Sequence, residues 1–138
     1  MEIWKAWIPE VKMPTFKFLH YMGCRITEKG LVINLEDEDE SSRKITVSFL
    51  DGYLSNRETD EGGIYDTLCD IYAYANEEKW KTANFLKVEN SNYVQWFKDQ
   101  NFGKYKDVEI SHYMIIAFDV ISEILSTGTP KIEISEWR

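Results

Sequence analysis

LVINLEDEDESSRKITVSF, the stretch from Leu31 to Phe49, contains two runs of alternating apolar residues around an acidic run. An apolar residue at every second position is typical of a strand with one buried face. The polar segment 36–43 joins the two runs, so the stretch predicts an antiparallel hairpin with a long loop. The apolar residues on the two shared faces are Leu31, Ile33, Leu35, Ile45, Val47 and Phe49.

Further strands are expected before and after this hairpin. Asp51-Gly52 is a turn signal, which predicts a strand that starts at Tyr53. Ile110–Phe118 is a nearly unbroken apolar run, which is typical of a central strand covered on both faces. Shorter apolar segments predict the other strands, and the set is 16–22, 31–35, 45–49, 53–57, 85–88, 110–118 and 132–134.

Two further segments are less simple to interpret. Asp119 could cap a helix over Asp119–Ser126, but the β-branched residues and the short connection favour a strand, which we expect. The first eleven residues place Trp4 and Trp7 at helical spacing. Because Pro9 limits a helix there, an irregular segment or a short turn is expected.

Two helices complete the predicted fold. Apolar residues between Ile64 and Ala75 recur at helical spacing. Ser91 and Asn92 are favourable N-cap residues for a second helix, which Gly103 ends. The length of 138 residues is typical of one domain. We therefore expect a single α+β domain over 1–138, with a mostly antiparallel sheet of about six or seven strands and two packed helices.

The charge of the chain is negative and unevenly distributed. Sixteen Lys and Arg residues against 24 Asp and Glu residues give a net charge of −8. The segment Glu36–Glu78 holds 13 acids and three bases, a net of −10, so it carries the whole excess. This balance argues against binding to a nucleic acid or an anionic membrane. The acidic segment is either a solvated face or a surface that attracts a basic partner.

No motif assigns a catalytic residue, a metal site or a cofactor. A calcium-binding EF-hand loop that started at Asp37 would need Gly at position 42 and Glu at position 48. The sequence has Ser42 and Ser48 at those positions. Histidine–cysteine metal patterns and phosphate-binding glycine loops do not occur either. We therefore expect no cofactor.

The spacing of the cysteines and the length of the apolar runs indicate where in the cell the protein is expected. Cys24 and Cys69 lie far apart without a CxxC spacing, so two buried, reduced thiols are expected rather than a disulfide. The N-terminal segment lacks the pattern of a signal peptide, and the longest apolar run is too short to span a bilayer. We expect a cytoplasmic protein.

The most distinctive polar segment is Asn56–Gly62, which combines one Arg with three acids. It either presents a charged recognition loop or holds Arg57 against a neighbouring acid that anchors the loop. His112 lies in an apolar run, where a core or edge histidine with a backbone hydrogen bond is expected. Contact with Cys69 or Cys24 would instead create a thiol–imidazole pair.

Three segments, Asn56–Gly62, Phe85–Tyr93 and His112–Ile116, occur in an order that resembles small bacterial proteins of the Bacillus type. Some of those proteins resemble immunity proteins that are encoded beside polymorphic toxins. The resemblance covers roughly Gly30–Ile134 and includes no catalytic signature. It implies a toxin-neutralising role and no active site.

The charge pattern and this resemblance together predict a non-enzymatic acidic protein-binding domain, and specifically an immunity protein. Its expected partner is a basic protein such as a toxin, since carboxylates oppose a basic surface and accelerate the encounter. No nucleic-acid or membrane partner is expected. The predicted contact residues are Glu36, Asp37, Glu38, Asp39, Glu40, Arg57, Glu58, Asp60 and Glu61.

The alternative is a small enzyme or a small-molecule-binding domain with a cleft between the sheet and the helices. Its candidate residues are His112, Cys69 and the carboxylates of segment 57–61. A concave site in which a histidine lies within hydrogen-bond reach of an acid or a thiol would distinguish this alternative from a binding domain.

Overall fold

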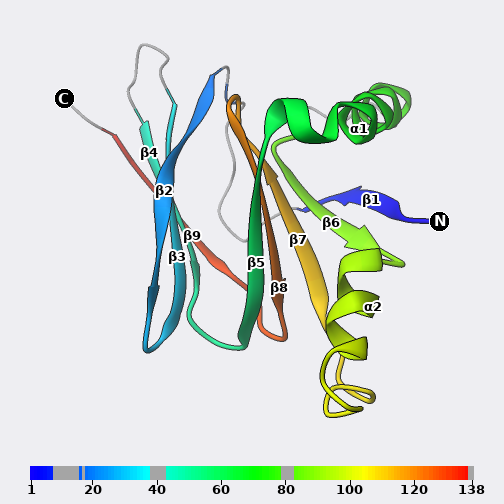
Figure 1. Cartoon of the computed structure of the whole chain (residues 1–138). Coiled ribbons are helices and arrows are strands. Elements are labelled where there is room, and N and C mark those ends of the chain that lie inside the picture. The colour runs from blue at the N-terminus through cyan, green and yellow to red at the C-terminus, as the bar shows by residue number, and fades with distance from the viewer. Residues whose placement is uncertain (8–15, 17, 38–42, 79–82, 137–138) are drawn as a thin grey trace.

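The computed structural model describes residues 1–7, 16, 18–37, 43–78 and 83–136 and has three layers (Figure 1). A four-stranded sheet is one outer layer, a five-stranded sheet is the middle layer, and the helices lie on the far side of the five-stranded sheet. The elements in chain order are β1 (Ile3–Ala6), β2 (Leu19–Thr27), β3 (Gly30–Asp37), β4 (Arg43–Phe49), β5 (Tyr53–Asp60), the 3-10 helix η1 (Glu61–Ile64), α1 (Tyr65–Glu77), β6 (Phe85–Glu89), α2 (Asn92–Asp99), β7 (Ser111–Ile116), β8 (Val120–Ser126) and β9 (Lys131–Glu136).

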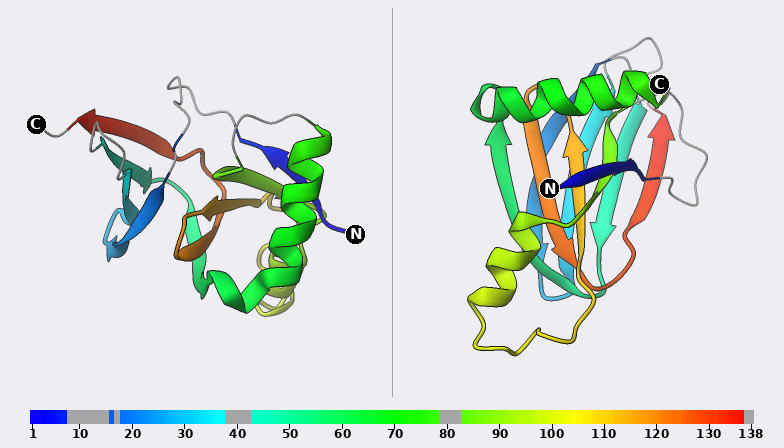
Figure 2. Two further views of the ribbon diagram at one scale, coloured as in Figure 1. Left: turned by 90° about the horizontal axis from the view of Figure 1, so that it is seen from above. Right: turned by 90° about the vertical axis from the view of Figure 1, so that its right-hand side faces the viewer.

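All strand pairs in both sheets are antiparallel. The strand order is β1-β6-β7-β8-β5 in the five-stranded sheet and β2-β3-β4-β9 in the four-stranded sheet. The predicted hairpin is the β3–β4 pair, in which Leu31 lies opposite Phe49 and Leu35 lies opposite Ile45. Helix α1 runs across the strands of the five-stranded sheet, as the right-hand view of Figure 2 shows.

The chain passes from one sheet to the other at two adjacent corners. Asp51-Gly52 connects β4 to β5, and segment 127–130 connects β8 to β9. Because β4 pairs with β9 and β5 pairs with β8, the two corners lie against each other. The Thr127 backbone N–H donates to the Gly52 carbonyl at 2.9 Å, and the Ser126 hydroxyl donates to the Gly128 carbonyl at 3.1 Å.

The main core fills the space between the two sheets. Each strand contributes the residues of one face, as the period of two requires. Trp7, Phe49 and Tyr113 meet there in edge-to-face contacts with centroid distances of 5.2 and 5.4 Å. The fully or nearly fully buried members include Leu31, Ile33, Leu35, Ile45, Val47, Phe49, Phe85, Ile115, Ile124 and Ile132.

A second core lies between the five-stranded sheet and α1. Leu68, Ile71 and Ala75 form the buried stripe of α1, which confirms the predicted helix. Leu68 and Ile71 pack on the other face of the sheet, against Leu86, Val88, Met114, Ile116 and Ile121. The central strands β7 and β8 are therefore covered on both faces, as the apolar run 110–118 predicted.

The α+β class, the two helices and the strand over Asp119–Ser126 are confirmed, but the described residues form nine strands in two sheets. The N-terminal segment was expected to be irregular, yet Ile3–Ala6 pairs with β6 as an edge strand. Strand β2 spans Leu19–Thr27, whereas the pattern predicted a strand over 16–22. A bulge between Tyr21 and Gly23 interrupts the alternation, so the sequence pattern ended at Met22 although the strand continues.

The expectation of two buried thiols is wrong, since Cys24 and Cys69 are both exposed and both free. The N-terminal tryptophans are half-buried, with Trp4 against the second core and Trp7 against the main core. Within the described ranges, no helix has the length and apolar character needed to cross a bilayer.

The adjacent corners predict a severe effect for Gly128→Ala. An added Cβ would lie 2.2 Å from the Asp51 carbonyl oxygen, which belongs to the backbone of the opposing corner. We expect a loss of about 1–3 kcal/mol in the free energy of unfolding, measured by urea denaturation. Gly62→Ala is the control, because its nearest atom lies 3.4 Å away. Equal stability of the two variants would contradict the tight corner.

Candidate functional site

A chain of charged and polar side chains lies on the helix-facing side of the five-stranded sheet. The Arg57 guanidinium donates to both carboxylate oxygens of Glu123, at 2.7 and 3.1 Å. His112 Nε2 lies 2.9 Å from Glu123 Oε1, and His112 Nδ1 lies 2.7 Å from Ser91 Oγ. The Arg57 guanidinium also stacks on the ring of Tyr93, 4.1 Å from its centroid.

Strand register and a helix cap bring these groups together. Arg57 on β5 lies directly opposite Glu123 on β8, and β7 carries His112 on the other side of β8. Ser91 is the N-cap of α2, where its hydroxyl accepts from the Val94 backbone N–H at 3.0 Å. The cap therefore connects α2 directly to the buried network.

Glu123 is ionised and determines the proton positions in the network. Burial alone would raise its pKa, but the hydrogen bonds from His112 and Arg57 outweigh burial and lower the pKa to about 2. An ionised carboxylate only accepts, so the uncharged form of His112 carries its proton on Nε2. Nδ1 is then the acceptor, and the Ser91 hydroxyl donates to it.

His112 and Ser91 also line a groove with a volume of about 920 Å³. We call it the α2 groove, because α2 and the turn before it form one wall. Strands β1 and β6 and segment 109–112 form the rest. The Lys5–Glu89 ion pair, at 3.0 Å, lies at its border, and Lys98 lies on its α2 side.

A carboxylate of the chain occupies the N-terminal end of α2, where Asn92 lines the groove. Glu2 Oε2 accepts from the Asn92 backbone N–H at 2.9 Å, and the Asn90 side chain donates to the Met1 carbonyl at 3.5 Å. The first N–H groups of a helix carry positive partial charge and favour anionic oxygens. The N-terminal residues thus lie at the start of α2.

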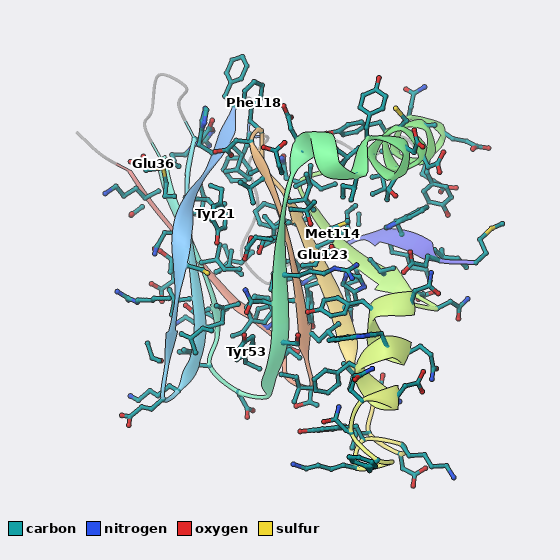
Figure 3. All side chains as sticks on the ribbon, viewed as in Figure 1. Tyr21, Glu36, Tyr53, Met114, Phe118 and Glu123 are labelled. Carbon is teal, nitrogen blue, oxygen red and sulfur yellow. The ribbon has the colours of Figure 1, made fainter. Side chains whose placement is uncertain are left out.

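A second polar cluster closes one edge of the space between the sheets, where Tyr21 lies between β2 and β5 (Figure 3). Glu58 accepts from Ser122 at 3.0 Å and from Asn56 at 3.3 Å, and Asn56 also accepts from the Tyr53 hydroxyl. Partial burial raises the pKa of Glu58, and the hydrogen bonds offset only part of that effect. Burial likewise raises the pKa of Tyr21.

The structure distributes the predicted acidic contact residues over several places. Glu36 lies on the face of the four-stranded sheet away from the helices (Figure 3), opposite Lys44. Asp37 is buried and accepts from Arg43 at 2.9 Å, so it adds no exposed charge. Glu38, Asp39 and Glu40 lie outside the described residues.

The distinctive segment Asn56–Gly62 is mostly strand rather than loop, since β5 extends to Asp60. Arg57 does anchor it, but its acid is Glu123, which lies 66 residues along the chain. Asp60 accepts from the Gly62 backbone N–H at 2.9 Å at the start of η1, and Glu61 is exposed. Arg57, Glu58 and the pair Asp60–Glu61 therefore belong to three different environments.

His112 differs from both sequence-based expectations. Its ring contacts two side chains, Ser91 and Glu123, rather than a backbone group. Both ring nitrogens are thereby occupied, and neither Cys24 nor Cys69 contacts them, so the thiol–imidazole pair is not formed.

The largest concentration of exposed acids lies on η1 and α1. Segment Asp60–Glu78 contains six acids and no base, and all six acids are exposed. We call these residues the α1 acidic surface; they are Asp60, Glu61, Asp66, Asp70, Glu77 and Glu78. Two exposed tyrosines, Tyr65 and Tyr72, lie among them.

Sequence reasoning missed Glu123 and recognised Ser91 only as a helix cap. A signal for Glu123 was present, because it is a single acid inside the apolar segment 120–125. A charge at such a position requires a partner. The sequence did not indicate that the partners are His112 and Arg57, since strand order determines both.

Comparison with known proteins adds no assignment to these groups. No family model, no curated protein and no solved structure matches the chain. Over the described ranges, no group of three or more His, Cys, Asp or Glu side chains could hold a metal ion. Contacts, burial and charge are what indicate a function.

The network predicts an acid-dependent loss of stability through Glu123. Because its pKa in the folded protein lies below the ordinary 4.5, its contribution is present above about pH 4.5 and is lost as the pH falls toward 2. At pH 7, Glu123→Gln should lower the free energy of unfolding by about 3 kcal/mol, and the difference from the unmodified protein should shrink at pH 2.5.

Chemical denaturation at pH 7, 4.5 and 2.5 measures this difference. Glu133→Gln is the control, because its ion pair with Lys131 is largely exposed and should contribute less than about 1 kcal/mol. A Glu123→Gln variant that stays as stable as the control at pH 7 would contradict the role of the network.

Glu58→Gln should change the free energy of unfolding in the opposite direction to Glu123→Gln. A pKa raised above 4.5 in the folded protein means that ionised Glu58 opposes folding, so stability is lost as the pH rises through that pKa. At pH 7 the variant should gain less than about 1 kcal/mol, because the carboxylate is partly exposed. Thermal unfolding at pH 4 and pH 7 tests this, and a destabilised variant at pH 7 would refute it.

Proposed function

We propose that the protein is an acidic protein-binding domain, and more specifically an immunity protein that neutralises a basic toxin by binding it on the α1 acidic surface. The observation that carries this proposal is the charge of that surface, six exposed acids with no base in Asp60–Glu78. The sequence resemblance to immunity proteins supports a toxin as the basic partner.

The acids of α1 point away from the core. At 3.6 residues per turn, Asp66, Asp70 and Glu77 fall within about 40° of one another around the helix axis, over a length of about 16 Å. Leu68, Ile71 and Ala75, which fix the helix on the sheet, lie on the opposite side. The packed sheet therefore holds the charged stripe in a fixed orientation toward solvent.

The exposed tyrosines supply contact area beside this charge. Tyr65 is 68% exposed and Tyr72 is 52% exposed. Tyrosine is enriched in protein interfaces, since it buries a large ring and keeps a polar group. Carboxylates around such rings would direct a basic protein to the surface and accelerate its association, most strongly at low salt.

The variant Asp66→Lys/Asp70→Lys/Glu77→Lys tests this function. A matched control with the same change in charge, Glu28→Lys/Asp107→Lys/Glu133→Lys, alters exposed acids elsewhere. Each tagged protein is used to capture partners from a lysate of the producing strain at low salt. The unmodified protein and the control variant should both retain a basic protein. The association rate of the α1 variant with that basic protein should be at least tenfold lower.

The purified partner separates binding from neutralisation. Expression of the captured partner in a test strain should stop growth. Co-expression of the unmodified protein or of the control variant should restore growth. Equal association rates for the α1 variant and the control would exclude the α1 acidic surface. A partner that does not affect growth would exclude the immunity role.

The α2 groove favours a second candidate function, binding of a small molecule between α2 and the sheet. The specific observation is that the groove holds His112 within hydrogen-bond distance of an acid, at 2.9 Å from Glu123. Cys69 and the carboxylates of segment 57–61 do not line the groove, so they are no longer candidates for this function.

A further inference from the structure

Ser91, His112 and Glu123 form a hydroxyl–imidazole–carboxylate series. The two links measure 2.7 Å, between Ser91 Oγ and His112 Nδ1, and 2.9 Å, between His112 Nε2 and Glu123 Oε1. In such a series the imidazole accepts the hydroxyl proton and the carboxylate holds the ring in the required tautomer. Capping of α2 uses the Ser91 oxygen as an acceptor, so the hydroxyl proton remains directed at His112 Nδ1.

Two of the three groups are buried, and the third is accessible from the groove. His112 and Glu123 are 2% and 5% exposed, while Ser91 is half-buried and lines the α2 groove. A substrate carbonyl could therefore approach the hydroxyl from the groove while the base remains shielded from water. Glu123 stays ionised through Arg57, so the tautomer with a proton on Nε2 is maintained.

A donor for a negatively charged oxygen lies beside Ser91. The Asn92 N–H, the next along the chain, points to an anionic oxygen already, since it binds Glu2 Oε2 at 2.9 Å. Backbone N–H groups at a helix start stabilise the oxyanion of acyl transfer. Glu2 is part of the chain and would compete with a substrate for this donor.

The geometry points to a catalytic site in the α2 groove that hydrolyses small carboxylic esters, with Ser91 as nucleophile, His112 as general base and Glu123 as the positioning residue. This activity goes beyond the proposed binding function and does not rest on it. Helices α1 and α2, which carry the acidic surface and one wall of the groove, lie at opposite ends of the helix-bearing side (Figure 1).

The reaction needs only the ester and water. Ser91 Oγ attacks the acyl carbon as its proton moves to His112 Nδ1, and the carbonyl electron pair moves to the oxygen held by the Asn92 N–H. The C=O bond then reforms, the bond to the leaving alcohol breaks, and His112 returns the proton to that alcohol. Water attacks the acyl-Ser91 in the same way, which releases the carboxylic acid and restores the hydroxyl.

The first test uses 4-nitrophenyl acetate as substrate. Ser91→Asn retains a favourable N-cap residue and removes the nucleophile. We expect it to lower kcat/KM at least 100-fold, while Ser135→Ala, which alters an exposed serine on β9 outside the groove, should change it less than threefold. Circular dichroism confirms that both variants are folded. An unchanged rate in Ser91→Asn would overturn the proposal.

Labelling of the unmodified protein is independent of any variant's folding. A fluorophosphonate forms a P–O bond with an activated serine and releases fluoride, so peptide mass spectrometry should locate the label on Ser91. Absence of label there after prolonged exposure would overturn the assignment.

Glu2→Ala gives a result that a merely capping Ser91 would not produce. Removal of this carboxylate frees the Asn92 N–H, so kcat/KM should rise about threefold to tenfold, whereas a purely structural network has no rate to raise. A fall in kcat/KM would overturn the assignment of Asn92 as the oxyanion donor.

Discussion

Glu123 is an ionised carboxylate in the middle of a strand that is covered on both faces. A charge in such a position is tolerated only with partners that satisfy its oxygens, because the loss of hydration is large. Arg57 from the neighbouring strand and His112 from the strand on the other side meet this requirement. His112 in turn holds Ser91 at the start of α2. One buried charge therefore connects β5, β7, β8 and α2, and both the position of α2 and the chemistry of its groove depend on it.

The double coverage of the five-stranded sheet follows from how the chain passes between the sheets. At the adjacent corners around Gly52 and Gly128, the paired strands β4 and β9 of one sheet continue as the paired strands β5 and β8 of the other. This connection places the β3–β4 hairpin over one face of the five-stranded sheet. The opposite face then requires cover, and the apolar stripe of α1 supplies it. The outward side of α1 is free to carry charge, because none of its acids takes part in packing. The same arrangement thus separates an acidic surface on α1 from a polar groove beside α2.

The elements that sequence analysis predicted best are those whose signal is local. The hairpin around the acidic run, the apolar stripe of α1 and the cap at Ser91 were all identified from spacing within a few residues. Strand β1 was missed because four residues at an edge have too little pattern, and β2 was shortened because a bulge at Met22 shifts the alternation. The burial of Cys24 and Cys69 was predicted wrongly, since residue type alone does not determine which face of a strand or helix is covered. The acidic contact residues were treated as one region because they are close in sequence, whereas Asp37 lies buried beside Arg43 and Glu61 lies on the α1 acidic surface.

The sequence by itself determined the α+β class, the hairpin, the two helices and the concentration of acid in one part of the chain. Each of these depends on periodicity or on composition, which can be read over a short window. The tertiary structure alone decided that the strands form two sheets, that Arg57 pairs with an acid 66 residues away, and that Ser91, His112 and Glu123 form one series. These features depend on strand order and register, which are set by how the buried faces fit together across the whole chain. No local pattern encodes which strand lies beside which, so the network around Glu123 becomes visible only when the sheets are assembled.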